Sequence, residues 1–434
     1  MKLAVIGTGY VGLVSGTCFS EFGFDVTCID MDAGKIDSIR SGVMPIYEPG
    51  LEELVARNVD AGRLHFTTDT GAAVAAADAV FIAVGTPTRR GDGHADLTYV
   101  YEAARELAAH LTGYTVVVTK STVPVGTGRE VERIIREANP EADFDVASNP
   151  EFLREGAAIS DFMRPDRVVV GAESERARAV LEALYRPLYL IETPVLMTSL
   201  ETSELIKYAS NAFLAVKISY INQMADLCEK VGADVHDVSK GMGLDKRIGN
   251  KFLHPGPGYG GSCFPKDTLA LVRTAEDYRS DVSIVEGVVA YNAARKSAMA
   301  ARVIAASDGV DGKTIAILGL AFKPETDDMR DSPSLDIVPA LIEAGAKIRA
   351  YDPKSMHEAK PLLPAAVTFT DSAESCLGDA DVAVVVTEWN EFRALTPGHF
   401  LDAMRGTVLV DLRNIYKPED MRDAGLTYQS IGRI

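Results

Sequence analysis

The sequence is short of cysteine and of long apolar runs, and each shortage excludes a class of protein. It has five cysteines in 434 residues, and none of them forms a C-x-x-C pair, so neither a disulfide framework nor a zinc knuckle is expected. No apolar run approaches the roughly 18 residues that span a membrane, and the first residues hold no secretory signal. We therefore expect a cytoplasmic protein with no membrane partner.

The sequence also lacks an excess of basic residues. It has 62 acidic against 44 basic residues, for a formal net charge of −18. Nucleic acids and anionic membranes attract basic surfaces, so no nucleic-acid partner is expected. An anionic small ligand would need a local cluster of lysine and arginine. The hydrophobic fraction of 47% supplies a sizeable core, and the length predicts two or three domains.

Short apolar runs alternate with helical stretches at both ends of the sequence, whereas the middle is helical. A proline-free stretch at 198–231 has apolar residues at helical spacing, which predicts one helix of roughly 30 residues, about 45–50 Å long. A second helix is expected at 283–306. The pattern predicts an α/β fold with two Rossmann-like, doubly wound domains joined by a long central helix and a helical middle domain. The expected boundaries are 1–196, 197–310 and 311–434. Strands are expected at 2–7, 25–30, 78–84, 115–120, 144–148 and 167–171, and again at 314–319, 347–351, 382–387 and 407–411.

A glycine-rich turn follows the first expected strand. It reads Gly7-Thr8-Gly9-Tyr10-Val11-Gly12, and Asp30 closes the next expected strand 18 residues later. Strand, glycines and acid in this order are typical of a dinucleotide site, in which the acid binds the ribose hydroxyls. Because a 2′-phosphate would repel Asp30, we expect NAD rather than NADP. Lys35 either contacts the adenosine end or lies in solvent.

Hydroxyl side chains follow two further strands. Gly85-Thr86-Pro87 and Lys120-Ser121-Thr122-Val123-Pro124 come at expected carboxyl ends, where ligands of doubly wound sheets bind. These hydroxyls either reach the nicotinamide half of the cofactor or cap the turns.

Two pairs of polar residues are spaced four apart. Glu151 and Glu155 would share a face if 151–155 is helical, and could then move protons or order water; a solvated loop is the alternative. Lys207 and Asn211 share a face of the long helix. Lys207 either extends to solvent, which its residue type favours, or is held as a buried cation that stabilises an oxyanion.

The segment 251–267 (KFLHPGPGYGGSCFPKD) is the most informative. Its four glycines and two prolines between Pro255 and Gly261 predict a loop whose backbone amides approach a ligand. The loop leads to Cys263, which Lys266 and Asp267 follow. A nearby cation and carboxylate favour a nucleophilic cysteine, whereas the other four cysteines fit inert buried positions.

These motifs occur in an order that resembles a known family. G-T-G-Y-V-G, G-T-P, K-S-T-V-P-V-G-T, N-P-E-F-L-R-E, K-Y-A-S-N-A, G-Y-G-G-S-C-F-P-K-D and G-L-A-F-K-P-E-T-D-D-M-R-D-S-P span residues 1 to about 335. The chain thus resembles the nucleotide-sugar 6-dehydrogenases. The resemblance implies a four-electron oxidation of a sugar alcohol to a carboxylate with two NAD in succession.

The resemblance also implies a role for each position. Cys263 would be the nucleophile that forms a thiohemiacetal and then a thioester. Lys207 and Asn211 would stabilise oxyanions, while Asp267, Glu151 and Thr122 would order water and move protons. Residues expected to bind NAD are Gly7, Gly9, Tyr10, Val11, Gly12, Asp30, Lys35, Thr86, Thr122, Glu155, Lys266 and Arg330. Residues expected to bind the nucleotide sugar are Glu151, Phe152, Leu153, Arg154, Glu155, Lys207, Asn211, Arg247, Phe252, Leu253, His254, Pro255, Gly256, Tyr259, Gly260 and Lys323.

The substrate and assembly follow from the same resemblance. Residues 246–253 and Arg413 are similar to the branch that oxidises UDP-glucose, rather than GDP-mannose or UDP-N-acetylmannosamine. In the family an arginine at the position of Arg247 reaches the partner subunit, so a homodimer or larger assembly is expected. A two-electron hydroxyacid dehydrogenase would need neither Cys263 nor residues 313–434. A non-catalytic NAD sensor would leave the 255–267 loop and Lys207 unexplained.

Overall fold

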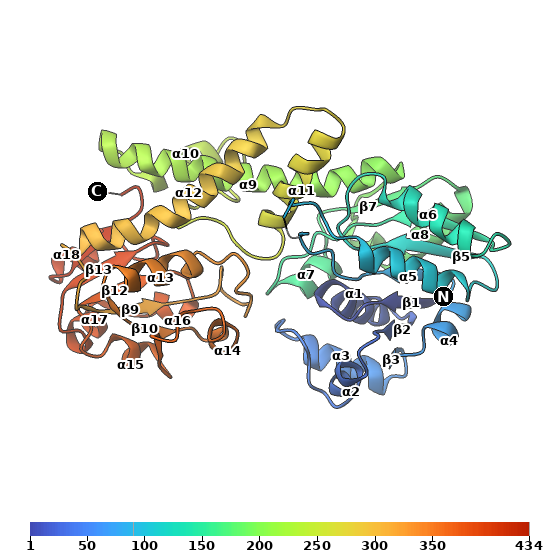
Figure 1. Cartoon of the computed structure of the whole chain (residues 1–434), viewed down its shortest axis with the longest axis horizontal. Coiled ribbons are helices and arrows are strands. Elements are labelled where there is room, and N and C mark those ends of the chain that lie inside the picture. The colour runs from blue at the N-terminus through green and yellow to red at the C-terminus, as the bar shows by residue number, and fades with distance from the viewer. Residues whose placement is uncertain (90, 434) are drawn as a thin grey trace. The chain divides into compact units, whose positions relative to one another are not determined.

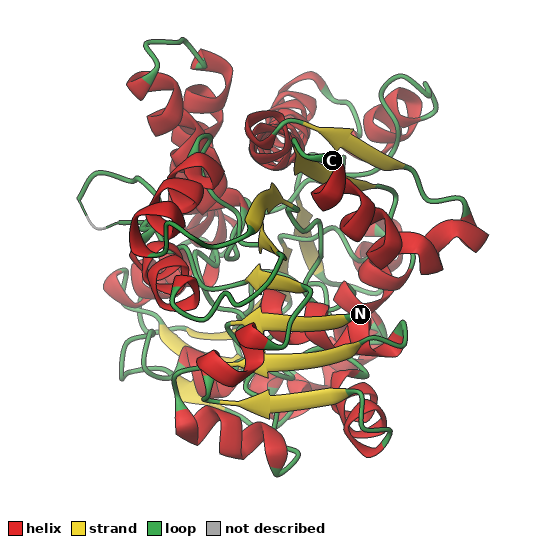
Figure 2. Ribbon diagram, turned by 90° about the vertical axis from the view of Figure 1, so that its right-hand side faces the viewer, coloured by secondary structure: helices red, strands yellow, loops and turns green. Residues whose placement is uncertain are grey.

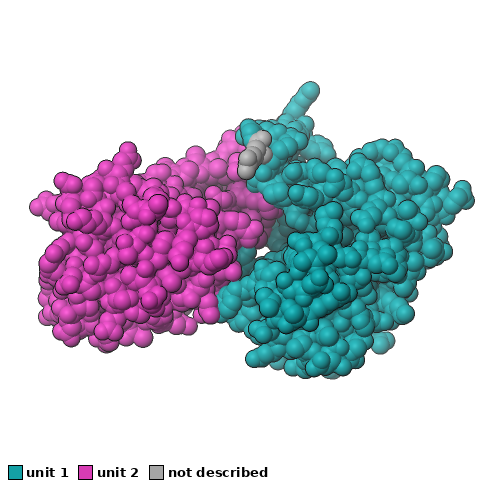
Figure 3. Space-filling view, turned by 60° about the horizontal axis from the view of Figure 1, so that its bottom comes forward, with its two compact units in different colours: residues 1–210, 273–279 teal, residues 211–272, 280–434 magenta. Residues whose placement is uncertain are grey.

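The computed structural model describes residues 1–89 and 91–433. The chain divides into two compact units, coloured teal and magenta in Figure 3. Unit 1 comprises residues 1–210 and 273–279, and unit 2 comprises residues 211–272 and 280–434. Each unit contains one sheet with a hydrophobic core on either face.

Unit 1 is built on an eight-stranded sheet in the order β3-β2-β1-β4-β5-β6-β7-β8. Alternate residues of β1 belong to different cores, with Leu3 and Val5 on one face and Ala4 and Ile6 on the other. This period of two buries the sheet between helices on both sides (Figures 1 and 2). The strands are β1 Lys2–Ile6, β2 Asp25–Ile29, β3 Leu64–Thr67, β4 Ala79–Ile82, β5 Thr115–Thr119, β6 Phe144–Ser148, β7 Val168–Ala172 and β8 Val195–Thr198.

The helices of unit 1 cover the two faces separately. Leu13 of α1 and Leu54 of α3 join one core, whereas Leu107 of α5 and Val131 of α6 join the other. The helices are α1 Tyr10–Glu21, α2 Ala33–Arg40, α3 Leu51–Asp60, α4 Thr70–Ala75, α5 Thr98–Ala108, α6 Thr127–Ala138, α7 Ala158–Met163 and α8 Glu175–Tyr185, with the 3₁₀ helix η1 Arg186–Ile191.

The sheet of unit 1 departs from the expected parallel pattern at one place. β6 and β7 pair antiparallel, with Ser148 opposite Gly171. The connection between them, residues 149–167, contains only the short helix α7 and does not cross over the sheet, so β7 runs back from the end at which β6 stops. The strands β3 and β8, which are short, were also not expected from the sequence.

A helical segment links the two sheets in sequence. The helix α9, Leu200–Val231, begins in unit 1 and ends in unit 2, and it confirms the single helix predicted for 198–231. In unit 2, Arg295 bonds to Asp226 at 2.8 Å and Arg302 pairs with Glu229, so α12 packs on α9. The other helices of this segment are α10 Val235–Gly243, α11 Phe264–Asp277 and α12 Ser283–Ala306.

Unit 2 contains a six-stranded parallel sheet in the order β11-β10-β9-β12-β13-β14. Its two faces are again covered by different cores, in which Ile317 and Leu318 of β9 take opposite sides. The strands are β9 Thr314–Leu318, β10 Lys347–Tyr351, β11 Thr368–Phe369, β12 Val382–Val385, β13 Val408–Asp411 and β14 Thr427–Ser430; the helices are α13 Ser334–Glu343, α14 Met356–Ala359, α15 Ala373–Leu377, α16 Asn390–Arg393, α17 Pro397–Ala403 and α18 Pro418–Asp423.

The structure confirms the fold class and the ten predicted strands. In the part of the chain that the structure describes, no helix is both long and apolar enough to cross a bilayer.

Candidate active site

The glycine-rich turn of unit 1 leaves room for a ligand at one position. Gly7 has φ +101°, and a Cβ on Gly12 would lie 1.9 Å from the carbonyl oxygen of Gly7, so the backbone requires both glycines. A Cβ on Gly9 would meet nothing within 4 Å. Gly9 also begins α1 without a side-chain cap. Open space beside uncapped N–H groups fits the pyrophosphate of NAD.

Asp30 follows β2, and its hydrogen bonds stabilise the charged form of its carboxyl group. Its carboxylate accepts hydrogen bonds from the Thr8 backbone N–H at 3.0 Å, the Thr8 hydroxyl at 2.7 Å and Lys35 Nζ at 2.9 Å. Burial opposes the charge, but the bonds from Thr8 and Lys35 outweigh it and lower the pKa of Asp30 to about 2. Lys35 therefore contacts Asp30 rather than only solvent.

A buried carboxylate that the sequence did not reveal supports the same turn. Glu48 accepts a hydrogen bond from the Tyr10 hydroxyl and one each from the N–H groups of Gly156 and Ala158, both at 2.7 Å. Burial and Glu48 raise the pKa of Tyr10. Glu48 thus joins α1 to the segment after β6. It lies between Tyr47 and Pro49 with no spacing pattern that marks it.

The hydroxyl residues at the ends of β4 and β5 bind one another's loops. Thr86 donates to the Thr122 carbonyl at 2.9 Å, and Ser121 donates to the Val84 carbonyl at 2.7 Å. These bonds hold the Thr122 backbone at the carboxyl edge of the sheet.

Lys207 and Glu151 form a buried ion pair in unit 1. Lys207 Nζ lies 3.0 Å from Glu151 Oε1, and the side chains are 3% and 5% exposed. Lys207 therefore does not extend to solvent, although its residue type favoured that alternative. It is held as a buried cation. The condition for Glu151 and Glu155 to share a helical face also fails, because 151–157 is not helical and α7 begins at Ala158.

The neighbours of Glu151 have different partners. The Leu153 N–H donates to Glu151, and the guanidinium of Arg167 lies 3.6 Å from the centre of the Phe152 ring. Arg154 pairs with Asp161. The segment is thus a loop held by side chains.

Asn211 and Asp267 belong to unit 2, where they form a second buried cluster. Asn211 Nδ2 donates to Asp267 Oδ2 at 2.6 Å, and Lys266 Nζ lies 2.6 Å from Asp267 Oδ1. Asp267 is 1% exposed. The structure thus brings together three of the predicted residues around one carboxylate.

Cys263 differs from the other four cysteines. It is half-buried, immediately precedes α11, and its Sγ lies 3.4 Å from the Ser262 hydroxyl. A helix N-terminus favours an anionic group. Cys18, Cys28, Cys228 and Cys376 are buried, and burial raises the pKa of each of these thiols.

The glycine-rich loop before Cys263 is packed within unit 2. The N–H groups of Gly256 and Tyr259 donate to Asn222 and Asn292 at 2.8 Å, and that of Gly261 donates to the Arg330 carbonyl at 2.7 Å. These three N–H groups therefore donate within unit 2, and the role of the loop in ligand binding stays a prediction. A Cβ on Gly260 would lie 2.4 Å from the Asp331 oxygen, so close packing requires this glycine.

The remaining predicted residues of unit 2 have separate environments. Arg330 pairs with Asp328, and Arg247, which is 89% exposed, pairs with Asp245. Arg413 donates to the Val386 and Phe322 carbonyls at 2.7 Å. Other predicted positions are Phe252 with φ +64°, the buried Leu253 and Pro255, the exposed His254, and Lys323, whose Nζ lies 5.4 Å from the Phe322 ring.

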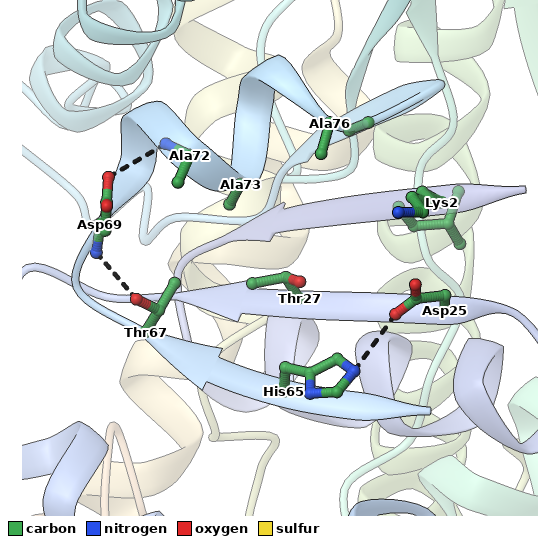
Figure 4. Close-up of a pocket in the computed structure, with 11 residues that line it drawn as sticks. Lys2, Asp25, Thr27, His65, Thr67, Asp69, Ala72, Ala73 and Ala76 are labelled. Carbon is green, nitrogen blue, oxygen red and sulfur yellow. Dashed lines mark hydrogen bonds and ion pairs between the residues drawn. The ribbon is translucent and has the colours of Figure 1, made fainter. Parts of the chain in front are cut away.

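A pocket of about 330 Å³ lies elsewhere in unit 1, along β1, β2, β3 and α4 (Figure 4). Asp25 and His65 face each other across neighbouring strands at 3.3 Å, whereas Asp69 caps α4 at the other end of the pocket, near Thr67. Its lining contains no predicted site residue.

Comparison with known proteins identifies the family. The family models of the UDP-glucose/GDP-mannose dehydrogenase family match residues 1–189 (NAD binding domain), 201–294 (central domain) and 316–418 (UDP binding domain). The UDP-glucose 6-dehydrogenase of Rhizobium meliloti (strain 1021) is 61% identical over 436 residues, covering 100% of both chains. The UDP-glucose 6-dehydrogenase TuaD of Bacillus subtilis (strain 168) is 48% identical, covering 100% of this chain and 93% of the relative.

A solved structure gives the same result. The UDP-glucose dehydrogenase from the hyperthermophilic archaeon Pyrobaculum islandicum matches with a TM-score of 0.92 and 39% identity, over 100% of this chain and 98% of that chain. The resemblance read from the motifs is therefore confirmed, and the chain belongs to the UDP-glucose/GDP-mannose dehydrogenase family.

Proposed function

We propose that the chain oxidises the primary alcohol of UDP-glucose to the carboxylate of UDP-glucuronate, a four-electron reaction with two NAD. The observation that carries the proposal is the half-buried Cys263 at the start of α11, on the same helix as the buried Asp267 and its partners Asn211 and Lys266. The similarity of the chain to proteins named UDP-glucose 6-dehydrogenase supports UDP-glucose as the substrate.

Unit 1 supplies the cofactor side of the proposal. Gly9 and the N-terminus of α1 receive the pyrophosphate, and Asp30 accepts hydrogen bonds from the adenosine ribose. NAD, when bound, supplies the hydride acceptor for each two-electron oxidation. Further contacts are assigned to Gly7, Tyr10, Val11, Gly12, Lys35, Thr86, Thr122, Glu155, Lys266 and Arg330.

The side chains of the two clusters handle charge and protons. Lys207 and Asn211 lie one turn apart on α9, and we assign them to oxyanion stabilisation at carbon 6. Asp267, Glu151 and Thr122 accept and return protons and order water.

Cys263 supplies the nucleophile. Its thiolate adds to the aldehyde carbon, and the carbonyl oxygen takes a proton to give a thiohemiacetal. The second two-electron oxidation leaves a thioester on Sγ. Water then attacks the thioester carbon, the C–S bond breaks, and the carboxylate and the free thiol are released. Thiol chemistry of this kind suits a reducing cytoplasm, which is the location we propose.

We assign the following further positions to contacts with the nucleotide sugar. The relevant positions are Phe152, Leu153 and Arg154, the 252–256 stretch, Tyr259, Gly260 and Lys323, in addition to the residues above. We also propose that the chain has three functional domains, residues 1–196, 197–310 and 311–434.

A homodimer completes the proposal. Phe213, Tyr220 and Leu227 recur every seven residues of α9 and are exposed, and such a stripe is typical of a helix that packs against another subunit. Arg247 is the residue we assign to the partner's substrate. Arg247→Ala should raise the KM for UDP-glucose and leave NAD binding unchanged, and light scattering that finds an active monomer would contradict the assembly.

The test of the chemistry replaces the nucleophile. Cys263→Ala should fold and bind NAD but lose most uronic-acid production, also when the UDP-sugar aldehyde is supplied directly. Cys228→Ala removes a buried cysteine of the same unit and serves as the matched control. Two NADH per sugar at the unaltered rate from folded Cys263→Ala would refute the thioester route. NADH yield from UDP-glucose, GDP-mannose and UDP-N-acetylmannosamine identifies the substrate.

A further inference from the structure

The loop that carries Thr122 is joined at its far end to α9 by a carboxylate. The helix α6 begins after Gly126, which has φ +94° and has no side chain to cap the helix. Glu204 of α9 replaces the missing cap: the Gly126 N–H donates to Oε2 and the Gly128 N–H to Oε1, both at 2.7 Å. The exposed N–H groups of a helix start are therefore satisfied by a residue 76 positions away in the sequence.

The space around this carboxylate is closed. Glu204 is 2% exposed, and a Cβ on Gly128 would lie 3.2 Å from Oε1. Position 128 is therefore small because Glu204 occupies the adjoining volume. Both N–H groups point at the two carboxylate oxygens, an arrangement that an amide cannot reproduce, since its nitrogen is a donor.

Glu204 also connects the loop to the buried ion pair. It precedes Lys207 by one helical turn, and Lys207 pairs with Glu151. In the same turn the Ser203 hydroxyl donates to the Ser148 carbonyl at the end of β6. One turn of α9 thus bonds to the start of α6 and to the end of β6.

We propose that Glu204 is a positioning residue for the cofactor reaction, holding the Thr122 loop against α9. The inference rests on the proposed function, because it takes Thr122 as a contact of NAD. Thr86 donates to the Thr122 carbonyl near the start of the loop, and Glu204 accepts from the Gly126 N–H at its end. Loss of either bond therefore lets the Thr122 hydroxyl move.

The charge of Glu204 gives this role a pH signature. Burial raises the pKa of Glu204 to about 7, against the lowering effect of the two N–H donors. The charged groups that act on it are Glu201 of its own helix, which raises the pKa, and Arg129 of α6, which lowers it; the ring hydroxyl of Tyr101 on α5 in turn experiences its charge. Protonation below neutral pH removes one acceptor and should loosen the loop.

The test measures NAD binding by calorimetry without the sugar, at pH 6 to 8. Wild-type affinity should weaken about fivefold from pH 8 to pH 6, the cost of a lost helix cap. Glu204→Gln should bind about fivefold more weakly at pH 8 and show little pH dependence. Its kcat with saturating NAD should fall less than its KM for NAD rises. Glu182→Gln, which changes an exposed carboxylate on α8 of the same unit, should behave as wild type.

The outcomes separate the two proposals. Folded Glu204→Gln with wild-type affinity and an unchanged pH profile would overturn the role of Glu204. Should Glu204→Gln fail to fold, Gly128→Ala displaces the same carboxylate and should weaken NAD binding in the same direction; no change would again overturn the inference. Wild type that binds NAD but does not oxidise UDP-glucose would refute the proposed substrate and leave Glu204 to be judged by NAD affinity alone. Wild type that binds no NAD would refute both.

Discussion

The two sheets have corresponding strand orders but use their carboxyl edges differently. β3-β2-β1-β4-β5-β6 of unit 1 corresponds to β11-β10-β9-β12-β13-β14 of unit 2. In each, the first strand is followed by a glycine with positive φ, Gly7 at +101° and Gly319 at +92°. In each, the second strand is followed by an aspartate, Asp30 or Asp352. The strand, glycine and acid of a dinucleotide site are therefore present twice.

The two aspartates differ in what fills their hydrogen-bonding capacity. Asp30 is 13% exposed and bonds to Thr8 and Lys35 beside an open turn. Asp352 is 1% exposed and accepts from the Leu320 and Ala321 N–H groups and from Trp389 Nε1. The indole thus lies where unit 1 keeps its acid accessible. A strand–glycine–acid pattern predicts a dinucleotide site only where the chain leaves the acid accessible to a ligand.

The corresponding strands β5 and β13 also end differently in the two units, one at a basic and the other at an acidic residue. β5 is followed directly by a buried lysine, Lys120, which donates to Asn149 at 2.9 Å and to the Tyr185 hydroxyl at 3.3 Å. β13 ends at the buried Asp411, which accepts from three backbone N–H groups and Tyr428. Unit 1 thus holds a buried lysine near its ligand edge, and unit 2 holds a carboxyl group bound by its own loop.

The largest effect is expected at the acid of unit 2. Asp352→Ala leaves at least three buried donors unpaired, which should lower the free energy of unfolding of unit 2 by about 3–5 kcal/mol. Trp389 is the chain's one tryptophan, so urea unfolding followed by tryptophan fluorescence reports this unit. Asp371→Ala, an exposed control in the same unit, should change little. A shift of similar size in both variants would show that Asp352 does not organise the edge.

The next effect concerns cofactor choice at the acid of unit 1. A 2′-phosphate at about 4 Å from Asp30 costs roughly 1–4 kcal/mol, or about one to three decades of discrimination. Asp30→Asn should therefore narrow the ratio of kcat/KM between NAD and NADP by about that factor, while Trp389 fluorescence reports unchanged stability of unit 2. Equal efficiency of wild type with both cofactors would refute the assignment.

The sequence predicted those features that depend on local patterns. Apolar residues recur every two residues in a strand and every 3.6 residues in a helix, because each segment buries one or both of its own faces. This pattern can be found within a single segment, so ten strands and the helix α9 were predicted correctly. The glycine-rich turn and Asp30 follow from backbone sterics within thirty residues.

The features that were missed depend on contacts between distant segments. Glu48, Glu204 and Lys120 are buried polar groups whose partners lie 29 to 110 residues away, and no local spacing marks them. The same holds for the loop before Cys263, where glycines that suggested a ligand instead admit the packing of Phe322 and Asp331. The residue type of Lys207 alone favoured solvent over a buried position, because only the fold reveals its partner Glu151.

A smaller effect is expected for the buried Lys120 of unit 1. Burial lowers the pKa of Lys120 to about 7, so between about pH 7 and 10 the unfolded chain binds a proton that the folded chain does not. Wild-type stability should therefore rise with pH relative to Lys120→Met, by about 2 kcal/mol between pH 7 and 9. Urea unfolding by far-UV circular dichroism measures this, with the exposed Lys2→Met as control. A pH-independent difference would show that Lys120 stays protonated.

The smallest effect is the stability that Asp30 itself contributes to unit 1. Its pKa in the folded chain is lowered to about 2 by Thr8 and Lys35, so the unfolded chain binds the proton first as the pH falls. The contribution is therefore complete above about pH 4 and is lost as the pH falls through 2. Partial exposure and screening limit it to about 1 kcal/mol. At pH 5, the free energy of unfolding of Asp30→Asn, measured by urea unfolding, should be lower than that of wild type by about 1 kcal/mol. Near pH 2 the two should coincide, because the protonated carboxyl and the amide both carry no charge. A difference that persists at pH 2 would mean that Asp30, like Asp352, acts through buried hydrogen bonds rather than through its charge, and the contrast between the two edges would fail.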